Sequence, residues 1–132
     1  MSLLIHRHIK TVLFSDKDIK AKIGDRLFPI VAPEGTYLYP YVVMKRIGSN
    51  PDMSKDGDFE TTDVRLTIVG KQYTETVELA DLIKKVLIEN CEADYKDFMV
   101  LDSEFVPLSD GEDWDDVQNC YVELLDFNFA TT

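Results

Sequence analysis

The sequence predicts an α+β fold in which a mainly antiparallel β-sheet packs against an N-terminal helix and a central helix. Two segments repeat apolar residues every three or four positions, as amphipathic helices do, and the segments around them alternate or cluster β-branched and aromatic residues, as strands do. No internal repeat, low-complexity tract or linker interrupts this order. We therefore expect one domain over residues 1–132.

The composition indicates a folded, acidic domain. Of the 132 residues, 14 are Lys or Arg and 25 are Asp or Glu, which gives a formal net charge of −11 at pH 7. Hydrophobic residues make up 45% of the chain, which is enough to build a core without disulfides or metals. A negative surface repels nucleic-acid phosphates, so sequence-specific DNA binding is disfavoured. No apolar run approaches the roughly 20 residues that cross a bilayer, so we expect no membrane segment and no export signal.

Helical periodicity occurs in three places. The first helix is expected over residues 3–13 with Ser2 as its N-cap, and a short second helix over residues 15–23 that Gly24 closes. The central helix is expected over residues 74–90, because Val77, Ala80, Ile83 and Leu87 form one apolar stripe, and Thr74 or Thr76 is its expected cap.

Strand patterns fill the rest of the chain. Residues 26–31 and 39–47 are expected to form a hairpin or short meander, followed by a long polar loop over residues 48–58. Residues 59–69 alternate apolar and polar side chains, which predicts a strand with one solvated face. Residues 98–108 and 117–129 are expected to form an antiparallel pair joined by an acidic loop.

Two acidic loops invite functional hypotheses. Residues 52–63 place oxygen-bearing side chains and a Gly at spacings that imitate a calcium-binding loop, but Asp63 replaces the usual bidentate Glu and no helices flank the loop. A solvated hairpin loop is the alternative. Residues 110–116 carry five carboxylates around Trp114, and an exposed Trp is typical of an interface. The alternative is that Trp114 folds back onto the sheet edge.

The sequence offers no catalytic or metal-binding motif. His6 and His8 are two residues apart on one helix, so they lie on different faces and cannot bind one metal together. Cys91 and Cys120 are far apart in the sequence with no second pair, so core thiols are the simplest interpretation. No nucleophile motif or phosphate-binding glycine loop occurs. We therefore expect a protein that is not an enzyme, with no catalytic residues, no bound metal and no cofactor.

Four short motifs follow one another in a recognisable order. They are Gly-Asp-Arg-Leu-Phe-Pro at residues 24–29, Ala-Pro-Glu-Gly at 32–35, Tyr-Pro-Tyr-Val-Val at 39–43 and Leu-Ala-Asp at 79–81 within the central helix. With the polar loop, the alternating strand and the final strand, the pattern resembles the tail-completion, or tail-terminator, family of tailed bacteriophages and prophages. The resemblance spans roughly residues 3–129, with Tyr39 in place of the usual leucine.

The resemblance implies a prophage-encoded structural virion protein that forms a ring, often a hexamer, at the junction between tail and head. Such a ring stops growth of the tail tube and contacts the tail tube protein and the head connector proteins, while DNA passes through without specific binding. The protein is then made in the cytoplasm of the bacterial host. No catalytic residues accompany the family.

These observations lead to one main hypothesis and one alternative. The main hypothesis is a joining protein whose two polar loops contact neighbouring subunits or partner rings. Its expected interface residues are Met53, Asp56, Phe59, Trp114 and Asp115. The alternative is a small ligand-binding or calcium-binding α+β domain, or a hydrolytic enzyme, with a pocket between the sheet and the central helix.

Overall fold

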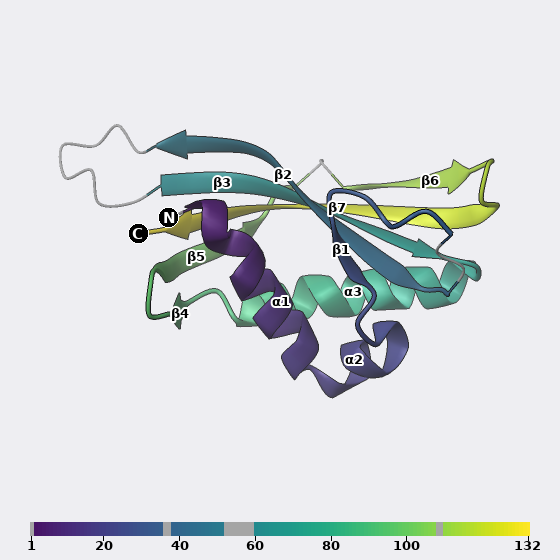
Figure 1. The fold of residues 1–132 in the computed structure, drawn as a ribbon, viewed down its shortest axis with the longest axis horizontal. Coiled ribbons are helices and arrows are strands. Elements are labelled where there is room, and N and C mark those ends of the chain that lie inside the picture. Colours follow the sequence, from purple (N-terminus) through teal and green to yellow (C-terminus); the bar gives the residue numbers. More distant parts are fainter. Residues whose placement is uncertain (1, 36–37, 52–59, 108–109) are drawn as a thin grey trace.

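The computed structural model describes residues 2–35, 38–51, 60–107 and 110–132, and in this part of the chain it forms helices packed on one face of a curled sheet (Figure 1). The expected α+β fold is confirmed. In chain order the elements are η1 (Ser2–Leu4), α1 (Ile5–Ser15), α2 (Lys17–Ile23), β1 (Leu27–Pro29), β2 (Tyr41–Pro51), β3 (Glu60–Gly70), α3 (Tyr73–Glu89), β4 (Ala93–Asp94), β5 (Met99–Phe105), β6 (Gly111–Asp115) and β7 (Cys120–Thr131).

The sheet is built around β7. Its strand order is β1-β2-β3-β7-β5-β4, and β6 also pairs with β7. One edge of β7 pairs with β3 from Thr131 to Tyr121. The other edge pairs first with β6 and then with β5. All of these pairs are antiparallel, and only β1 and β2 run parallel among the described strands.

The core lies between the helices and one face of the sheet. On β3 the alternation predicted from the sequence buries Val64, Leu66 and Ile68, and Leu66 lies opposite Leu125 of β7. The apolar stripes of α1 and α3 pack against this face, and each fully buried aliphatic side chain stabilises the fold by about 1.5–3 kcal/mol. The helix side chains buried there include Ile9, Leu13, Leu79, Ile83 and Leu87.

The ends of α1 and α2 differ in how they are capped. The N-cap of α1 is Leu4, which makes no side-chain cap bond, so the expected Ser2 cap is wrong: Ser2 lies in the preceding turn of 3-10 helix. At α2 the Asp16 carboxylate accepts hydrogen bonds from two backbone N–H groups of the first turn. Gly24 ends α2 at φ 60°, as expected, in a conformation that favours glycine.

β1 and β2 do not form the expected hairpin. They pair in parallel, with Leu27 opposite Val42, so the connecting segment must return along the sheet before β2 begins. Arg26 explains this path, because its guanidinium donates hydrogen bonds to the carbonyls of Lys22 and Pro40 and thereby ties the end of α2 to the start of β2. The connection covers a small second core of Tyr41, Val69 and Cys120.

Two polar segments that were expected to be loops contribute residues to strands. β2 continues to Pro51, past the expected start of the long loop, and an irregularity between Arg46 and Gly48 leaves Ile47 bulged and exposed. The acidic segment around Trp114 is not a loop: it forms β6, which pairs with β7 so that Trp114 lies opposite Tyr121.

The start of α3 depends on a close contact with the end of β3. The N-cap is Gln72, without a side-chain bond, so neither Thr74 nor Thr76 is the cap. The Thr76 side chain is buried inside the first turn, and its hydroxyl donates to the Gln72 carbonyl at 2.6 Å. A Cβ atom added at Gly70 would collide with this hydroxyl.

Replacing Gly70 by Ala is expected to lower the free energy of unfolding by about 1–3 kcal/mol, because Thr76 is held by its hydrogen bond and has no room to move. Adding Thr76→Ala should recover part of this loss. Gly48→Ala is the matched control, since an added Cβ at that strand position meets nothing within 4 Å. Urea unfolding of the variants measures the effect, and equal losses at Gly70 and Gly48 would contradict it.

Candidate interaction surfaces

The structure describes two of the five residues expected at an interface. Trp114 and Asp115 lie at the end of β6, at the opposite end of the molecule from the N-terminus (Figure 1). Met53, Asp56 and Phe59 lie outside the described residues. Most of the suggested calcium-binding loop is outside them as well. Its final residue, Asp63, belongs to β3 and accepts a hydrogen bond from the Asn128 amide.

Three exposed aromatic side chains form a row at the β6 end of the sheet. Trp114 packs edge-on against Tyr121 with ring centroids 4.9 Å apart, and Tyr121 packs edge-on against Tyr73 at 5.5 Å. Trp114 remains 45% exposed and Tyr73 49% exposed. Trp114 therefore does fold onto its neighbouring strand, and part of its aromatic surface still faces solvent. Aromatic side chains exposed in this way are typical of protein interfaces.

Two glutamates lie side by side next to this row. Glu112 of β6 is directly opposite Glu123 of β7. Burial raises the pKa of Glu123 to about 7, and the hydrogen bond and the charge that Glu112 presents to it act in the same direction. The pKa of Glu112 is lowered by the hydrogen bonds from Glu123 and from Tyr73. Near neutral pH the pair thus shares one proton, which allows two carboxyl groups to lie in contact.

This pair makes stability depend on pH. The pKa of Glu123 is higher in the folded than in the unfolded chain, so its protonated form favours folding and stability falls as pH rises from about 4.5 through about 7. Glu123→Gln keeps a hydrogen-bond donor toward Glu112 and should raise the free energy of unfolding by about 1–3 kcal/mol at pH 8, with little effect at pH 4.5.

Unfolding measured from pH 4.5 to 8.5 tests this expectation. Glu104→Gln is the matched control, because Glu104 is exposed on the neighbouring strand β5. If Glu123→Gln and Glu104→Gln change the pH profile equally, the shared proton is not the cause.

The turn between β6 and β7 is held in a defined shape. The Asp115 carboxylate accepts hydrogen bonds from the backbone N–H groups of Val117 and Gln118, at 2.9 and 3.1 Å. The ammonium of Lys71 donates to the Gln118 carbonyl at 2.6 Å. Val117 at the tip is 91% exposed. Asp115 therefore shapes the turn, and Val117 is the apolar group that the turn presents.

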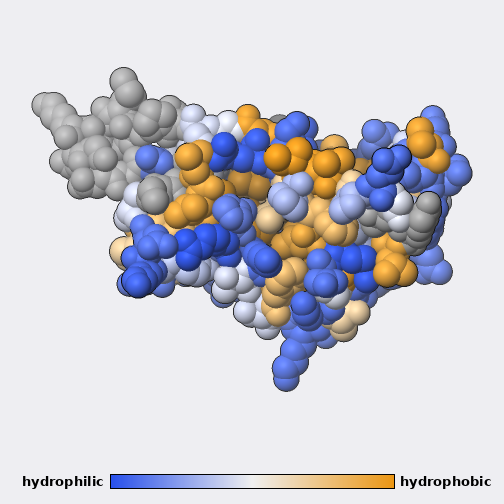
Figure 2. Space-filling view, in the orientation of Figure 1, coloured by the Kyte–Doolittle hydropathy of each residue, from blue (hydrophilic) through white to orange (hydrophobic). Residues whose placement is uncertain are grey.

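A groove of about 390 Å³ lies beside β2. Most of its lining is apolar, and His6, Lys45 and Arg46 are the polar residues at its rim. Arg46 lies opposite the buried Val64 on the face of β2 that the helices cover, whereas Lys45 lies opposite Arg65 on the other face. Figure 2 shows apolar surface gathered across the middle of this face, over the start of α1 and over β1 and β2. Among the wall residues, Leu3 is 63% exposed and Ile30 is 70% exposed. The apolar lining consists of Leu3, Ile5, Ile9, Pro29, Ile30, Met44 and Val64.

The described part of the chain contains no candidate metal centre, and a buried histidine beside a cleft has no free ring nitrogen. A cleft of about 300 Å³ between α1 and the end of α3 is lined by His8, but both ring nitrogens of His8 are engaged by Tyr95 and by the Asn90 carbonyl. The described residues contain no group of three His, Cys, Asp or Glu side chains placed to hold a metal. No described helix combines the length and the apolar composition that crossing a membrane requires.

Sequence reasoning missed both the groove and the row of aromatic residues. The groove combines residues from η1, α1, β1, β2 and β3, so no single segment carries its pattern. One local signal was present, because Ile30 and Val31 are large apolar residues that follow Pro29 in a turn-rich stretch, and both are 70% exposed.

These features define a class: a small α+β protein with a row of exposed aromatic residues at one end of its sheet and an apolar groove beside β2. Residues 7–118 match the family model for tail completion protein gp17. The chain therefore belongs to the tail completion protein gp17 family, and it is a structural tail protein of a bacteriophage or phage-like particle. The resemblance drawn from the sequence motifs is confirmed.

Solved structures support the fold. Eighteen chains match, and one of them belongs to a structure described as "Virion of native gene transfer agent (GTA) particle". Its TM-score is 0.73 at 12% sequence identity, and the match covers 93% of this chain and 90% of that chain. No curated protein sequence matches. At this identity the structural likeness establishes a shared fold.

Proposed function

We propose that this protein forms a closed ring that ends the tail tube of a phage-like particle and joins the finished tail to the head connector. The observation that carries the proposal is the family match over residues 7–118. The structural neighbour supports it, because that chain is part of a virion particle. In this proposal the partners are further copies of the chain, the tail tube protein and the head connector proteins. The ring is made in the host cytoplasm and lies at the junction of tail and head.

The shape and surface of the molecule are compatible with a ring. A ring of identical subunits needs two different surfaces on each copy that fit one another and close after a fixed number of steps. The aromatic row and turn at the β6 end and the groove beside β2 are two such surfaces, and they differ in shape and in charge.

The net charge suits a channel through which DNA passes. With a formal charge of −11 per chain, a ring of several copies repels phosphate groups and keeps them from sticking to its walls. This applies to those acidic side chains that face the lumen.

Two experiments test the proposal. Light scattering across a concentration series should give a mass several times that of the 15.1 kDa chain, whereas a monomer at every concentration would count against the ring. Particles produced without this protein should have tails of uncontrolled length and heads that remain separate. Normal, joined particles in its absence would overturn the joining role whatever the mass in solution.

A further inference from the structure

We propose that the β6–β7 turn of one copy docks into the groove beside β2 of the next copy, so that this head-to-tail contact builds the ring. The inference rests on the ring proposed above and names the two surfaces that meet. It follows from the shape, charge and free strand edges of these two regions.

The docking element is the end of β6 with the turn that follows. It projects Val117, which is 91% exposed, and Trp114, which is 45% exposed. The side chains of Asp113 and Asp116 flank these apolar groups and are themselves exposed. Because the Asp115 carboxylate and Lys71 fix the turn, little conformational entropy is lost when it is bound.

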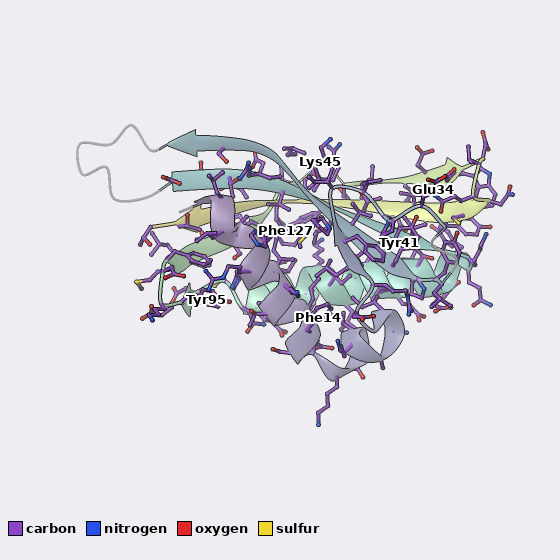
Figure 3. All side chains as sticks on the ribbon, viewed as in Figure 1. Phe14, Glu34, Tyr41, Lys45, Tyr95 and Phe127 are labelled. Atoms are coloured by element: carbon purple, nitrogen blue, oxygen red, sulfur yellow. The ribbon has the colours of Figure 1, made fainter. Side chains whose placement is uncertain are left out.

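The receiving element is the groove of about 390 Å³, which carries the opposite charge. Most of its lining is apolar, and Lys45 and Arg46 at its rim are exposed and form no ion pair with the described residues. Arg46 lies on the groove face of β2, and Lys45 lies on the opposite face of the same strand edge. Figure 3 shows Lys45 near the middle of β2, on the side away from α2. These two cations at the edge of β2 match the exposed carboxylates of Asp113 and Asp116 at the docking tip in charge. The Asp113 carboxylate accepts a hydrogen bond from the backbone N–H of Trp114, and neither carboxylate forms an ion pair with the described residues. In a protein with a net charge of −11, such a basic rim is a local exception that favours an acidic partner.

The docking element and the groove also match in a second way, because each lies beside a strand edge that no described strand pairs with. Beyond Met44, none of the described strands pairs with the side of β2 that faces away from β3. Likewise β6 pairs only with β7 among the described strands. Each copy thus offers one free edge beside the docking element and one beside the groove, and backbone pairing between copies can extend the sheet.

The two surfaces are on different parts of the molecule. The β6–β7 turn lies at one end of the long axis, whereas the free half of β2 extends toward the other end (Figure 1). A contact between unlike surfaces is heterologous, so it propagates from copy to copy and closes into a ring when the rotation per step allows it.

Charge reversal tests the contact. The groove variant carries Lys45→Glu and Arg46→Glu, and the tip variant carries Asp113→Lys and Asp116→Lys. Each alone places like charges against each other, so the concentration needed for assembly should rise about 100-fold or more. A chain that carries all four substitutions restores opposite charges and should assemble again, as should an equal mixture of the two variants. Lys17→Glu with Lys85→Glu is the matched control, since both lysines are exposed and lie away from the groove.

Light scattering gives the mass of each variant, and circular dichroism verifies that each is folded. Assembly by the groove or tip variant alone would overturn this contact and leave the proposed ring intact. Failure of the four-fold variant and of the mixture, with both two-fold variants monomeric, would show that the two surfaces do not meet each other. A wild-type chain that is monomeric up to about 1 mM would overturn the contact too, while the joining role is decided separately by particles that lack the protein.

Discussion

Replacing His8 by Leu is expected to lower the free energy of unfolding by about 2–4 kcal/mol at neutral pH. The His8 side chain is fully buried, with Nδ1 2.8 Å from the Tyr95 hydroxyl and Nε2 3.2 Å from the Asn90 carbonyl oxygen. It also packs edge-on against Phe129 of β7. In Figure 3, Tyr95 lies beside α1, the helix that carries His8. Leu fills a similar volume but leaves both partners without their hydrogen bond.

The same residue gives a pH dependence with a definite sign. Burial lowers the pKa of His8 below its ordinary value of 6.5, and the bond to Asn90 opposes this only in part. The unfolded chain therefore binds the proton more readily, so stability is lost as pH falls from 6.5 toward the pKa of the folded state. His8→Gln should remove this loss.

His6→Gln is the matched control, because His6 is exposed on the same helix. Protonation of Glu123 raises the free energy of unfolding as pH falls over part of this range, opposite to the effect of His8. Each variant must therefore be compared with the wild type at every pH. An unchanged acid profile in His8→Gln would refute the assignment.

Replacing Arg65 by Ala is expected to lower the free energy of unfolding by about 2–4 kcal/mol, which is more than the loss expected when its partner Asp126 is replaced by Ala. The guanidinium donates two hydrogen bonds to the Asp126 carboxylate, at 2.9 and 3.0 Å. The Asp126 side chain is only 6% exposed, whereas that of Arg65 is 42% exposed. Without Arg65 a buried carboxylate is left uncompensated. Without Asp126 the guanidinium can turn toward water.

The ion pair between Arg7 and Asp97 is the matched control. Its N–O distance is also 2.9 Å, but its side chains are 43% and 50% exposed. Arg7→Ala should therefore cost less than about 1 kcal/mol. Urea unfolding measures all three variants. Equal losses of unfolding free energy in Arg65→Ala and Asp126→Ala would show that burial of the Asp126 carboxylate does not determine the size of the loss.

The elements predicted correctly are those that carry their own pattern. α1, α3 and β3 repeat apolar residues at helical or strand spacing along one buried face, and the structure buries those faces. The antiparallel pairing of β5 with β7 also followed from their composition and order. For these elements the local sequence and the tertiary contacts favour the same conformation.

The elements predicted wrongly depend on partners elsewhere in the chain. β6 consists of Gly, Glu, Asp, Trp and Asp, a composition poor in strand formers, and it is a strand because β7 supplies a pairing edge. The parallel β1 and β2 are accompanied by hydrogen bonds from Arg26 to the carbonyls of Lys22 and Pro40, which lie far from each other in the sequence. These pairings between distant segments leave no pattern in the local sequence.

The candidate site was predicted only in part, for the same reason. Trp114 was identified as exposed, but its packing against Tyr121 requires the β6–β7 register. Asp115 was expected to contact a partner, and in the structure its carboxylate shapes the turn. Met53, Asp56 and Phe59 stay predictions, because they lie outside the described residues.

The central position of β7 affects how the protein folds during synthesis. β7 comes last among the described strands, yet it pairs with β3, β5 and β6 and so joins the two halves of the sheet. Until the ribosome has released residues 120–131, β3 has no partner on that edge, and the chain cannot close its core. Pairing between distant segments also slows folding. Copies shortened before β7 would lack both the finished sheet and the strand that supports β6, so we expect incomplete translation products to fail to fold.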